Sequence, residues 1–400
     1  MTILHAPPSA PDALPDRAPL VVRVREVVEV AGAHALDVDA APRFPNEAMA
    51  AMKGHGLLGL MVPQALGGES ASLSQLADAC YRLGAACPSA AMIFAMHQIQ
   101  VACLVRHAEG AAWHRTFLQR IAHDQLLLAS STTEGAGGGD VRASVAPIEQ
   151  VNGGISLVRD AAVMSYGEQA DAVVTTARRA TDAAGSDQTL VVFTRDQYTL
   201  QRTSNWDTLG MRGTCSAGFV LSAQAPAEQI LPVPYAEIHA QTMTPVAHLL
   251  WSASWAGIAA SAVERARQCL RKPLRDGSFQ LPPGLPHFTQ AVSSLRLLRA
   301  LLADALSRFE AADSSVALSA PNYQAGVTLL KVQASELAVG AVMSAMRASG
   351  LAGYRNDGPA SLGRHLRDIL SAPVMINNDR ILTSLSIAPL VGETPASIWS

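Results

Sequence analysis

The sequence predicts a mostly helical protein with a small β domain in its middle. The 400-residue chain is rich in Ala, Leu and Val, and only 5% of its residues are aromatic, which favours helices packed on helices. Residues 21–122, and the chain from residue 244 onward, carry apolar patterns of helical length, whereas 125–234 holds short runs rich in Val, Ile and Thr. Clusters of turn residues such as Asn152-Gly-Gly separate these runs. We therefore expect helices, then a sheet region, then helices again.

The change in period also predicts the domain boundaries. We expect a loosely ordered leader at 1–19, an N-terminal helical domain at 20–124, a β domain at 125–238 and a C-terminal helical bundle at 239–400. In the first domain, Phe44-Pro-Asn-Glu-Ala-Met opens a helix and Gly56-Leu-Leu-Gly closes it, because Pro and Gly mark helix ends. The other expected helices are 73–86, 90–107, 244–272, 287–312, 322–348 and about 377–390, and the expected strands include 126–129, 172–177 and 189–194.

Charge and cysteine usage exclude several classes of function. The net charge of −3 gives no electrostatic reason to expect binding to nucleic acid or to a membrane surface. The five cysteines form neither an even framework nor a metal-type pair, so we expect buried thiols in a reducing compartment. The apolar stretch 90–105 is interrupted by His97, Gln98 and Gln100 and is shorter than the roughly 20 residues of a spanning helix. Without an export signal, we expect a cytoplasmic protein.

The most informative segment is 129–140, Ala-Ser-Ser-Thr-Thr-Glu-Gly-Ala-Gly-Gly-Gly-Asp. It places hydroxyl side chains at the end of an apolar run of strand length, directly before a glycine-rich loop. The hydroxyls could bond a polar ring system that the glycine backbone approaches closely. A plain polar turn explains the same residues, and this segment alone does not separate the two interpretations.

Four motifs in order give the chain a resemblance to the acyl-CoA dehydrogenase family. Segment 129–140 resembles the Thr-Glu-Pro-Gly-Ala-Gly-Ser-Asp signature, and Trp206-Asp-Thr-Leu-Gly-Met-Arg-Gly-Thr214 resembles the second signature. Val163-Met-Ser-Tyr166 lies where the family has its flavin-contacting strand, and 349–368 resembles the C-terminal pattern. The resemblance implies a small β-barrel domain, a C-terminal four-helix bundle, FAD as cofactor and a homodimer or homotetramer. It further implies an acyl-CoA or related acyl thioester as substrate, and a flavoprotein or oxygen as electron acceptor.

By this resemblance, individual residues receive cofactor roles. Ser130, Thr132 and Thr133 would contact the ring edge of the flavin, and Ser165 would bond near its N5 or ribityl chain. The remaining expected contacts are Gly138 and Gly139 beside the pyrophosphate or the acyl carrier, Arg347 and Gly350 from a neighbouring subunit, and Asn378 and Arg380 near the C-terminus.

Three further segments bear on the resemblance. We expect Arg212 to clamp the β domain, and Trp206 to shield the flavin or to pack in the core. An Arg-x-x-Phe-Gly cofactor segment of the family is only a distorted trace at Arg271–Gly277. This departure implies that the adenine half of the cofactor is held differently or more weakly.

The sequence departs from the family at the catalytic base. Desaturation needs a carboxylate to remove the α-proton while a hydride leaves to flavin N5. The usual position of that glutamate falls at Ile376 or Asn377, and the alternative position used by a minority of the family falls at Ala247, beside His248. None of these side chains is an acid.

The expected function is FAD-dependent oxidation of an acyl thioester with Asp379 as the base, and three hypotheses about the missing glutamate remain open. Asp379 could act as the base from a shifted loop, although a helix-capping role suits it as well. His248 or His97 could act as the base in a rearranged pocket. Alternatively, the protein could be a flavin-dependent monooxygenase or N-oxygenase, which resemble this architecture and lack the glutamate, or a catalytically silent member. The C-terminus carries no basic cluster, which disfavours a DNA-associated member.

Overall fold

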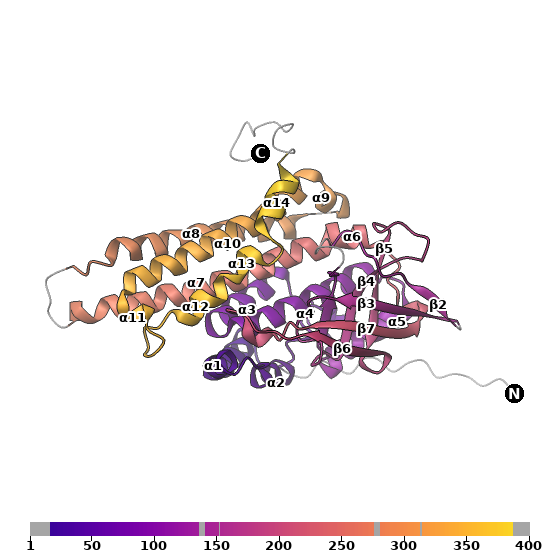
Figure 1. Ribbon diagram of the computed structural model, residues 1–400, viewed down its shortest axis with the longest axis horizontal. Helices are drawn as coiled ribbons and strands as arrows, with labels where there is room; N and C mark the ends of the chain where they lie inside the picture. The colour runs from indigo at the N-terminus through magenta and orange to yellow at the C-terminus, as the bar shows by residue number, and fades with distance from the viewer. Residues whose placement is uncertain (1–16, 136–140, 152, 276–280, 313, 387–400) are drawn as a thin grey trace.

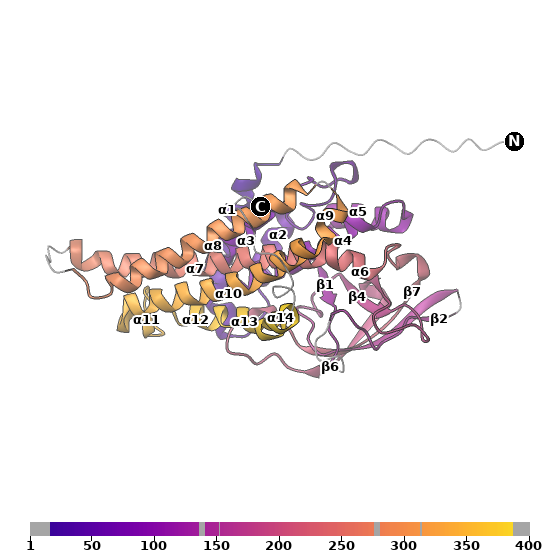
Figure 2. The same cartoon turned by 90° about the horizontal axis from the view of Figure 1, so that it is seen from above.

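Long helices and a smaller β domain form the molecule (Figures 1 and 2). The computed structural model describes residues 17–135, 141–151, 153–275, 281–312 and 314–386. The chain runs through N-terminal helices, two sheets and C-terminal helices, in the predicted order. In Figure 1, the bundle of α7, α8 and α10 extends away from the β domain, and the N-terminal helices lie beneath.

The N-terminal domain consists of five α-helices and one short 3-10 helix. They are α1 (Leu20–Ala40), α2 (Asn46–Gly54), η1 (Gln64–Leu66), α3 (Leu73–Ala86), α4 (Pro88–His107) and α5 (Ala112–Asp124). The helices expected at 73–86 and 90–107 are confirmed as α3 and α4. Helix α3 begins at a capping box, in which Ser72 and Gln75 each accept a hydrogen bond from the other's backbone N–H.

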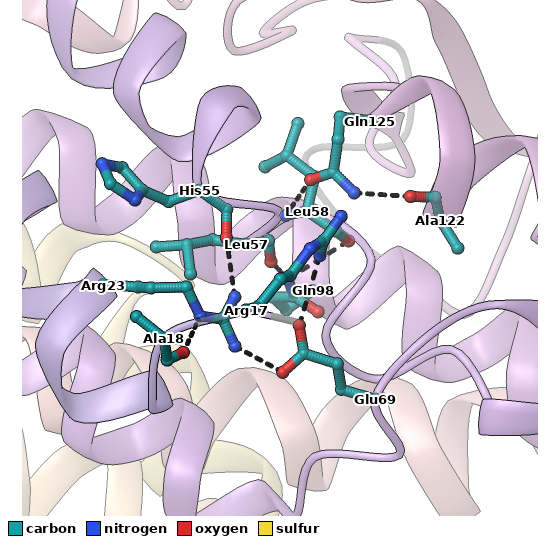
Figure 3. Close-up of polar contacts among 10 residues, drawn as sticks. All are labelled: Arg17, Ala18, Arg23, His55, Leu57, Leu58, Glu69, Gln98, Ala122 and Gln125. Carbon is teal, nitrogen blue, oxygen red and sulfur yellow. Dashed lines mark hydrogen bonds and ion pairs between the residues drawn. The ribbon is translucent and has the colours of Figure 1, made fainter. Parts of the chain in front are cut away.

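A polar network fixes the loop before α3 and α4 (Figure 3). Arg23 is buried and donates to the carbonyl oxygens of Ala18 (2.8 Å) and His55 (2.6 Å) and to Glu69. On the other side, Gln98 of α4 donates to the carbonyl of Leu57 at 2.9 Å. The loop at 55–58 is therefore bonded both to α1 and to α4, which fixes the position of α4.

In the part of the β domain that the structure describes, the strands form two sheets. One has the strand order β1-β4-β5 and the other β2-β3-β7-β6. The strands are β1 (Leu128–Ser131), β2 (Glu149–Val151), β3 (Gly154–Ala161), β4 (Ala172–Arg178), β5 (Gln188–Thr194), β6 (Tyr198–Ser204) and β7 (Gly218–Pro226), with η2 (Arg195–Gln197), η3 (Arg212–Thr214) and η4 (Ala227–Gln229) between or after them. β1 pairs with β4 in parallel, with Ser130 opposite Val174, and all other strand pairs are antiparallel. The predicted strands at 126–129, 172–177 and 189–194 correspond to β1, β4 and β5.

The C-terminal region is dominated by three long helices. Its elements are α6 (Tyr235–Ile238), the π-helical segment η5 (His239–Met243), α7 (Thr244–Arg275), α8 (Leu285–Ala311), α9 (Ser315–Ser319), α10 (Pro321–Ser349), α11 (Leu351–Tyr354), α12 (Gly363–Ile369), α13 (Ser371–Val374) and α14 (Asn378–Leu385). By length and composition, α4, the run from α6 into α7, and α10 could each cross a membrane. Most of the apolar window is buried within the fold in the first two, but only 50% of it is buried in α10.

The β domain is bonded directly to the C-terminal helices. The Met211 N–H donates to Oδ1 of Asp368 in α12 at 2.7 Å, and Asp368 is buried. A Cβ atom at Gly210 would lie 2.1 Å from the carbonyl oxygen of Arg367, so only glycine allows this approach. Two segments far apart in the sequence, 206–214 and 362–368, are thereby held together.

Candidate functional site

A cavity of about 450 Å³ lies where all three regions meet. Its volume falls within the range of about 300–1,000 Å³ that is usual for small-molecule sites. Side chains from α4, from the β domain, from the run α6–η5–α7 and from the segment after α12 line it. The lining residues are Met92, Met96, Ile99, Gln100, Ser130, Thr132, Thr133, Val141, Val163, Ser165, Tyr166, Trp206, Met211, Thr214, Ser216, Tyr235, His239, Met243, Thr244, Ala247, His248, Trp251, Ser371, Val374, Met375 and Ile376.

One wall carries the predicted hydroxyls of the first signature. Ser130 lies in β1, and Thr132 and Thr133 follow the strand directly. The structure brings all three to the cavity, and their side-chain hydroxyls make no hydrogen bond to a described residue. Three polar groups at a mostly apolar cavity, without protein partners, are available to a bound molecule.

A second row of hydroxyls lies beside them. Ser165, also predicted, bonds the Ser216 hydroxyl at 2.8 Å, and Ser216 bonds the Thr214 hydroxyl at 2.8 Å. Thr214 donates to the carbonyl of Met211 at 2.9 Å, which orients this chain of bonds. The sequence reasoning missed Ser216 and Thr214 as cavity residues. The available signal was their position, at and just after the end of the second signature.

A buried ion pair holds the start of the glycine-rich loop. Glu134, the residue after Thr133, accepts from Arg159 Nη1 at 2.8 Å, from the Ser144 hydroxyl at 2.6 Å and from the Val145 N–H at 2.6 Å. Burial lowers the pKa of Arg159 to about 10, while the Glu134 carboxylate opposes this effect. The pair fixes the backbone beside the predicted hydroxyls. Gly138 and Gly139 lie outside the described residues.

Trp206 and Arg212 have different positions in the second signature. Trp206 lines the cavity and donates from Nε1 to the Met211 carbonyl at 3.1 Å. Arg212 does not line the cavity, and its buried Nε has no hydrogen-bond partner among the described residues. A shielding position for Trp206 is thus compatible with the structure.

Helix α7 contributes a neutral histidine. His248 is buried and lines the cavity, and its Nδ1 donates to the carbonyl of Val327 at 2.9 Å. This bond leaves Nε2 as a hydrogen-bond acceptor, and no described residue bonds it. Burial lowers the pKa of His248 to about 4. The imidazole is therefore uncharged at neutral pH.

His97, the other histidine considered as a base, does not reach the cavity lining. Its Nε2 donates to the Leu58 carbonyl at 2.8 Å, and its Nδ1 accepts from the Leu128 N–H at 3.1 Å. Both ring nitrogens are used, so neither remains for a substrate. His97 instead bonds α4 to β1.

Two further buried polar groups line the cavity and were not predicted. Oε1 of Gln100 in α4 and Nε1 of Trp251 in α7 have no hydrogen-bond partner among the described residues. An unpaired buried polar atom costs about 1–3 kcal/mol, so each is a position at which a ligand could bond. Gln100 was noted as a polar residue that interrupts an apolar stretch, but no role in a site was assigned to it.

The C-terminal segment closes the cavity with apolar residues. Val374, Met375 and Ile376 line it, together with Ser371. Ile376, at one of the two positions where the family's glutamate was expected, has a φ of 47°. This conformation is rare for a β-branched residue and costs on the order of 1–3 kcal/mol. An aliphatic side chain thus occupies a wall where a carboxylate was sought.

Asp379, Asn378 and Arg380 were expected at the site, and the structure places them outside the lining of this cavity. Asp379 is exposed in the first turn of α14, and its N–H donates to the Asn377 side chain at 2.8 Å. Asn378 is buried, but its amide group bonds Lys331 (2.7 Å) and Glu336 (2.8 Å) instead of facing the cavity. Arg380 is exposed in the same turn. The physical reason is that Asn377 caps α14, and the chain turns away from the cavity after Ile376.

Arg347 and Gly350 lie at the other end of the bundle. Arg347 is exposed in the last turn of α10, and Gly350 ends that helix with a φ of 57°. In Figures 1 and 2, this junction of α10 and α11 is far from the β domain. Within one subunit they do not reach the cavity, so their expected role depends on a neighbouring subunit.

The residues around the cavity fit a flavin. The unpartnered hydroxyls of Ser130, Thr132 and Thr133 suit the polar edge of a flat ring, and Ser165 is oriented by its bond to Ser216. The apolar surfaces of Trp206 and Tyr166 suit its faces. These residues would hold the ring.

The chain belongs to the acyl-CoA dehydrogenase family. The model of the family's N-terminal domain matches residues 17–125, and that of its C-terminal domain matches residues 240–379. The chain is therefore a flavoprotein of the acyl-CoA dehydrogenase fold.

Proteins similar to this chain include oxygenases. The chain is 27% identical over 220 residues to the oxygenase component of an FADH2-dependent resorcinol hydroxylase from Rhizobium sp. (strain MTP-10005), a match that spans 54% of this chain and 49% of that protein. FMN-bound TdsC from Paenibacillus sp. A11-2, a dibenzothiophene monooxygenase, is 18% identical, with a TM-score of 0.81 over 95% of this chain and 100% of that one. A nitrososynthase from Micromonospora carbonacea var. africana is 21% identical, with a TM-score of 0.80 over 95% and 99% of the two chains. At these identities, the two structures support the fold.

Proposed function

We propose that the protein is a flavin-dependent monooxygenase that uses reduced FAD and O₂ to hydroxylate a small, neutral aromatic compound. The observation that carries the proposal is Ile376, which lines the cavity at a position where desaturating relatives would have their carboxylate. The FADH2-dependent and FMN-bound relatives support a flavin, and the expectation of FAD rests on the sequence motifs. When bound in its reduced form, the flavin supplies the two electrons that allow one oxygen atom to enter the substrate and the other to leave as water.

The composition of the cavity supports a neutral aromatic substrate. Methionine and aromatic side chains make up much of its surface, and none of the described lining residues is Asp, Glu, Lys or Arg. A charged carboxylate or phosphate would lose its hydration there without gaining an ionic partner. An uncharged ring would instead bury apolar area against Met92, Met96 and Trp251.

His248 would act on a hydroxyl of this substrate. Its Nδ1 is committed to Val327, so Nε2 can accept a hydrogen bond from the hydroxyl, which orients the ring and increases its electron density. Gln100 Oε1 and Trp251 Nε1 would bond further polar atoms of the substrate. His248 was predicted as an alternative base, and in this proposal it is a hydrogen-bond acceptor, because burial lowers its pKa to about 4.

The competing function is oxidation of an acyl thioester by α,β-desaturation. The match of the chain to both acyl-CoA dehydrogenase domain models favours it. It requires a base, and Asp379 would have to move from the exposed turn of α14 into the cavity. Desaturation also consumes no oxygen in the chemical step, so the two functions are separable in one experiment.

The decisive experiment compares the two reactions in the same preparation. Protein with chemically reduced FAD is given isotopically labelled O₂ and a panel of phenols, and products are examined by mass spectrometry. Separately, protein with oxidised FAD is mixed anaerobically with acyl-CoAs while the flavin absorbance is followed. Label in a hydroxylated product supports the proposal; bleaching of the flavin by a thioester, with no labelled product, would overturn it.

We further propose that the protein is a homodimer or homotetramer that assembles through the C-terminal helices. Exposed apolar side chains gather there, including Met343 of α10, Leu351 and Tyr354 of α11 and Leu370 at the end of α12. The half-buried apolar window of α10 supports the same surface. Light scattering on Leu351→Glu and Tyr354→Glu should show a smaller particle than for the unmodified protein.

A further inference from the structure

Lys331 is a lysine in the middle of α10 whose side chain is completely buried. Its Nζ donates to the Ile376 carbonyl at 2.9 Å and to the Asn378 Oδ1 at 2.7 Å, and it lies 5.8 Å from the centre of the Trp255 ring. No carboxylate among the described residues forms an ion pair with it. Burial lowers the pKa of Lys331 to about 8, and the nearby Glu336 carboxylate opposes only part of this effect. A buried ammonium group is costly and a methionine could fill the same space, so the hydrogen bonds of Lys331 point to a role beyond packing.

The partners of Lys331 indicate that role. The carbonyl that it holds belongs to Ile376, whose own backbone is strained at a φ of 47°. Such a conformation persists only where the surrounding structure enforces it. Asn378 is in turn fixed by the Ser335 hydroxyl (3.0 Å) and by Glu336 (2.8 Å), both on α10. Both ends of the strained turn are thus tied to one helix.

The strained turn is also part of the mouth of the cavity. Val374, Met375 and Ile376 line the cavity, yet Val374 is 69% exposed and Ile376 is 38% exposed. Residues that face both the cavity and the solvent form its rim. The turn at 375–377 therefore separates the cavity from water, and its conformation depends on the bonds from Lys331.

We propose that Lys331 is a positioning residue: it holds the strained turn at 375–377 as the rim of the cavity, and this rim keeps water away from the reaction. The role rests on the proposed oxygenation, in which substrate, O₂ and reduced flavin give hydroxylated substrate, water and oxidised flavin. If water enters, O₂ and reduced flavin instead give hydrogen peroxide and oxidised flavin, and the substrate is left unchanged. Lys331 touches neither substrate nor flavin in this role.

Hydrogen exchange tests the rim without any cofactor. In flavin-free protein, Lys331→Met should increase the exchange of the amides at 375–381 by about tenfold or more, because Met375 and Ile381 lose the fixed turn that orients their hydrogen bonds. Peptides from the middle of α10 should be unaffected. Lys53→Met is the matched control, since Lys53 pairs with Asp171 at 2.9 Å away from the cavity. Unchanged exchange at 375–381 in a folded Lys331→Met protein would overturn the proposal.

A second substitution separates the positioning role from a purely structural one. Ile376→Gly makes the positive φ unstrained, so the rim should depend less on the lysine. In this background, Lys331→Met should accelerate exchange at 375–381 by less than about half of the factor seen with Ile376 present, a non-additivity that a double-mutant cycle measures. Additive effects would contradict the proposal. If Lys331→Met does not fold alone, Asn378→Leu removes one of the two acceptors and should give a smaller increase in the same peptides.

The catalytic readout is the fraction of consumed oxygen that appears in product. Lys331→Met should lower this fraction by about threefold or more, and the oxygen lost from the product should appear as hydrogen peroxide. Lys53→Met should change neither quantity. If the unmodified protein forms no oxygenated product, the proposed function fails, but the exchange experiment still decides whether Lys331 holds the rim. If exchange increases but the oxygen fraction is unchanged, the rim is held by Lys331 but does not exclude water, and the proposal is overturned.

Discussion

The β-domain wall of the cavity and its C-terminal rim are built in opposite ways. The wall presents side-chain hydroxyls at the end of a strand: Ser130, Thr132 and Thr133 all lie within the four positions 130–133. The rim presents apolar side chains on a strained turn, and a lysine 45 residues earlier in the sequence holds it. Polarity that comes from neighbouring residues is visible as a motif, whereas a wall fixed by a distant partner is not. In our proposals, the wall binds the cofactor and the rim controls access to the cavity.

The largest expected effect concerns the histidine between these two regions. His248→Phe should lower the turnover number for hydroxylation by about 10²-fold, because the hydrogen-bond acceptor that orients the substrate hydroxyl is lost and that buried hydroxyl is left unpaired. His248→Gln, which keeps an acceptor, should retain more of the activity. If the turnover number of His248→Phe stays within threefold of that of the unmodified protein, the proposed role of His248 is wrong.

Acidification should weaken the fold through buried neutral histidines. The pKa values of His97 and His248 are lowered to about 4, so their contribution is complete above pH 6.5 and is lost as the pH falls through 4. Each of these histidines contributes roughly 3 kcal/mol to the free energy of unfolding when its contribution is complete. The pKa of Asp368 is raised to about 6, so its contribution has the opposite sign and grows as the pH falls from 6 to 3.8.

Urea unfolding at several pH values measures this balance. The free energy of unfolding should decrease between pH 6.5 and pH 4, with Asp368 offsetting part of the loss. His97→Gln should flatten the curve, because the variant has one proton fewer to bind on unfolding. A free energy of unfolding that is constant or increases over this range would contradict the expectation that both histidines are neutral in the fold.

The hydroxyl wall should affect flavin binding more moderately. Ser216→Ala removes the partner of both Ser165 and Thr214, and the dissociation constant for FAD should increase by about 5- to 10-fold, the equivalent of about one hydrogen bond. Quenching of flavin fluorescence measures it. Ser222→Ala is the control, since Ser222 is an exposed serine of β7, the strand that follows Ser216. If both substitutions increase the dissociation constant for FAD by the same factor, the hydroxyl wall has no special role in flavin binding.

The smallest expected effect belongs to the predicted base. Asp379→Asn should change turnover by less than about twofold, because the side chain is exposed outside the cavity and exposed substitutions have small effects. A loss of turnover of 10²-fold or more would indicate that Asp379, in the C-terminal segment, is the catalytic base. The assignment of that segment to access alone would then be wrong.

Much of the fold could be predicted because its signals are local. The periods of 73–86 and 90–107 and the β-branched runs at 172–177 and 189–194 depend on neighbouring residues, and the structure has elements at these positions. The hydroxyls at 130–133 and Ser165 belong to motifs, and the structure brings them to one cavity.

The remaining site residues depend on tertiary contacts. Asn378 was expected near the cofactor, but its direction is set by Lys331 and Glu336, which no local pattern connects to it. Counting along a motif gave Ile376 or Asn377 as the position of the glutamate, and Ile376 lines the cavity. Counting could not show that Asn377 caps a helix and turns Asp379 outward. His97 and His248 both lie in apolar helices, and only their bonding partners distinguish them.

The π-helical segment η5 gives the cavity an unusual sensitivity to chain length. It joins α6 to α7 without a break, and Tyr235 on one side and His248 on the other both line the cavity, as do His239 and Met243 within it. Deleting one residue of 239–243 would restore ordinary helical register and rotate everything before it by about 100° relative to α7. Tyr235 would then leave the cavity in a single step. A change of one residue in length could therefore alter the shape of this site as a unit, whereas substitutions alter it one side chain at a time.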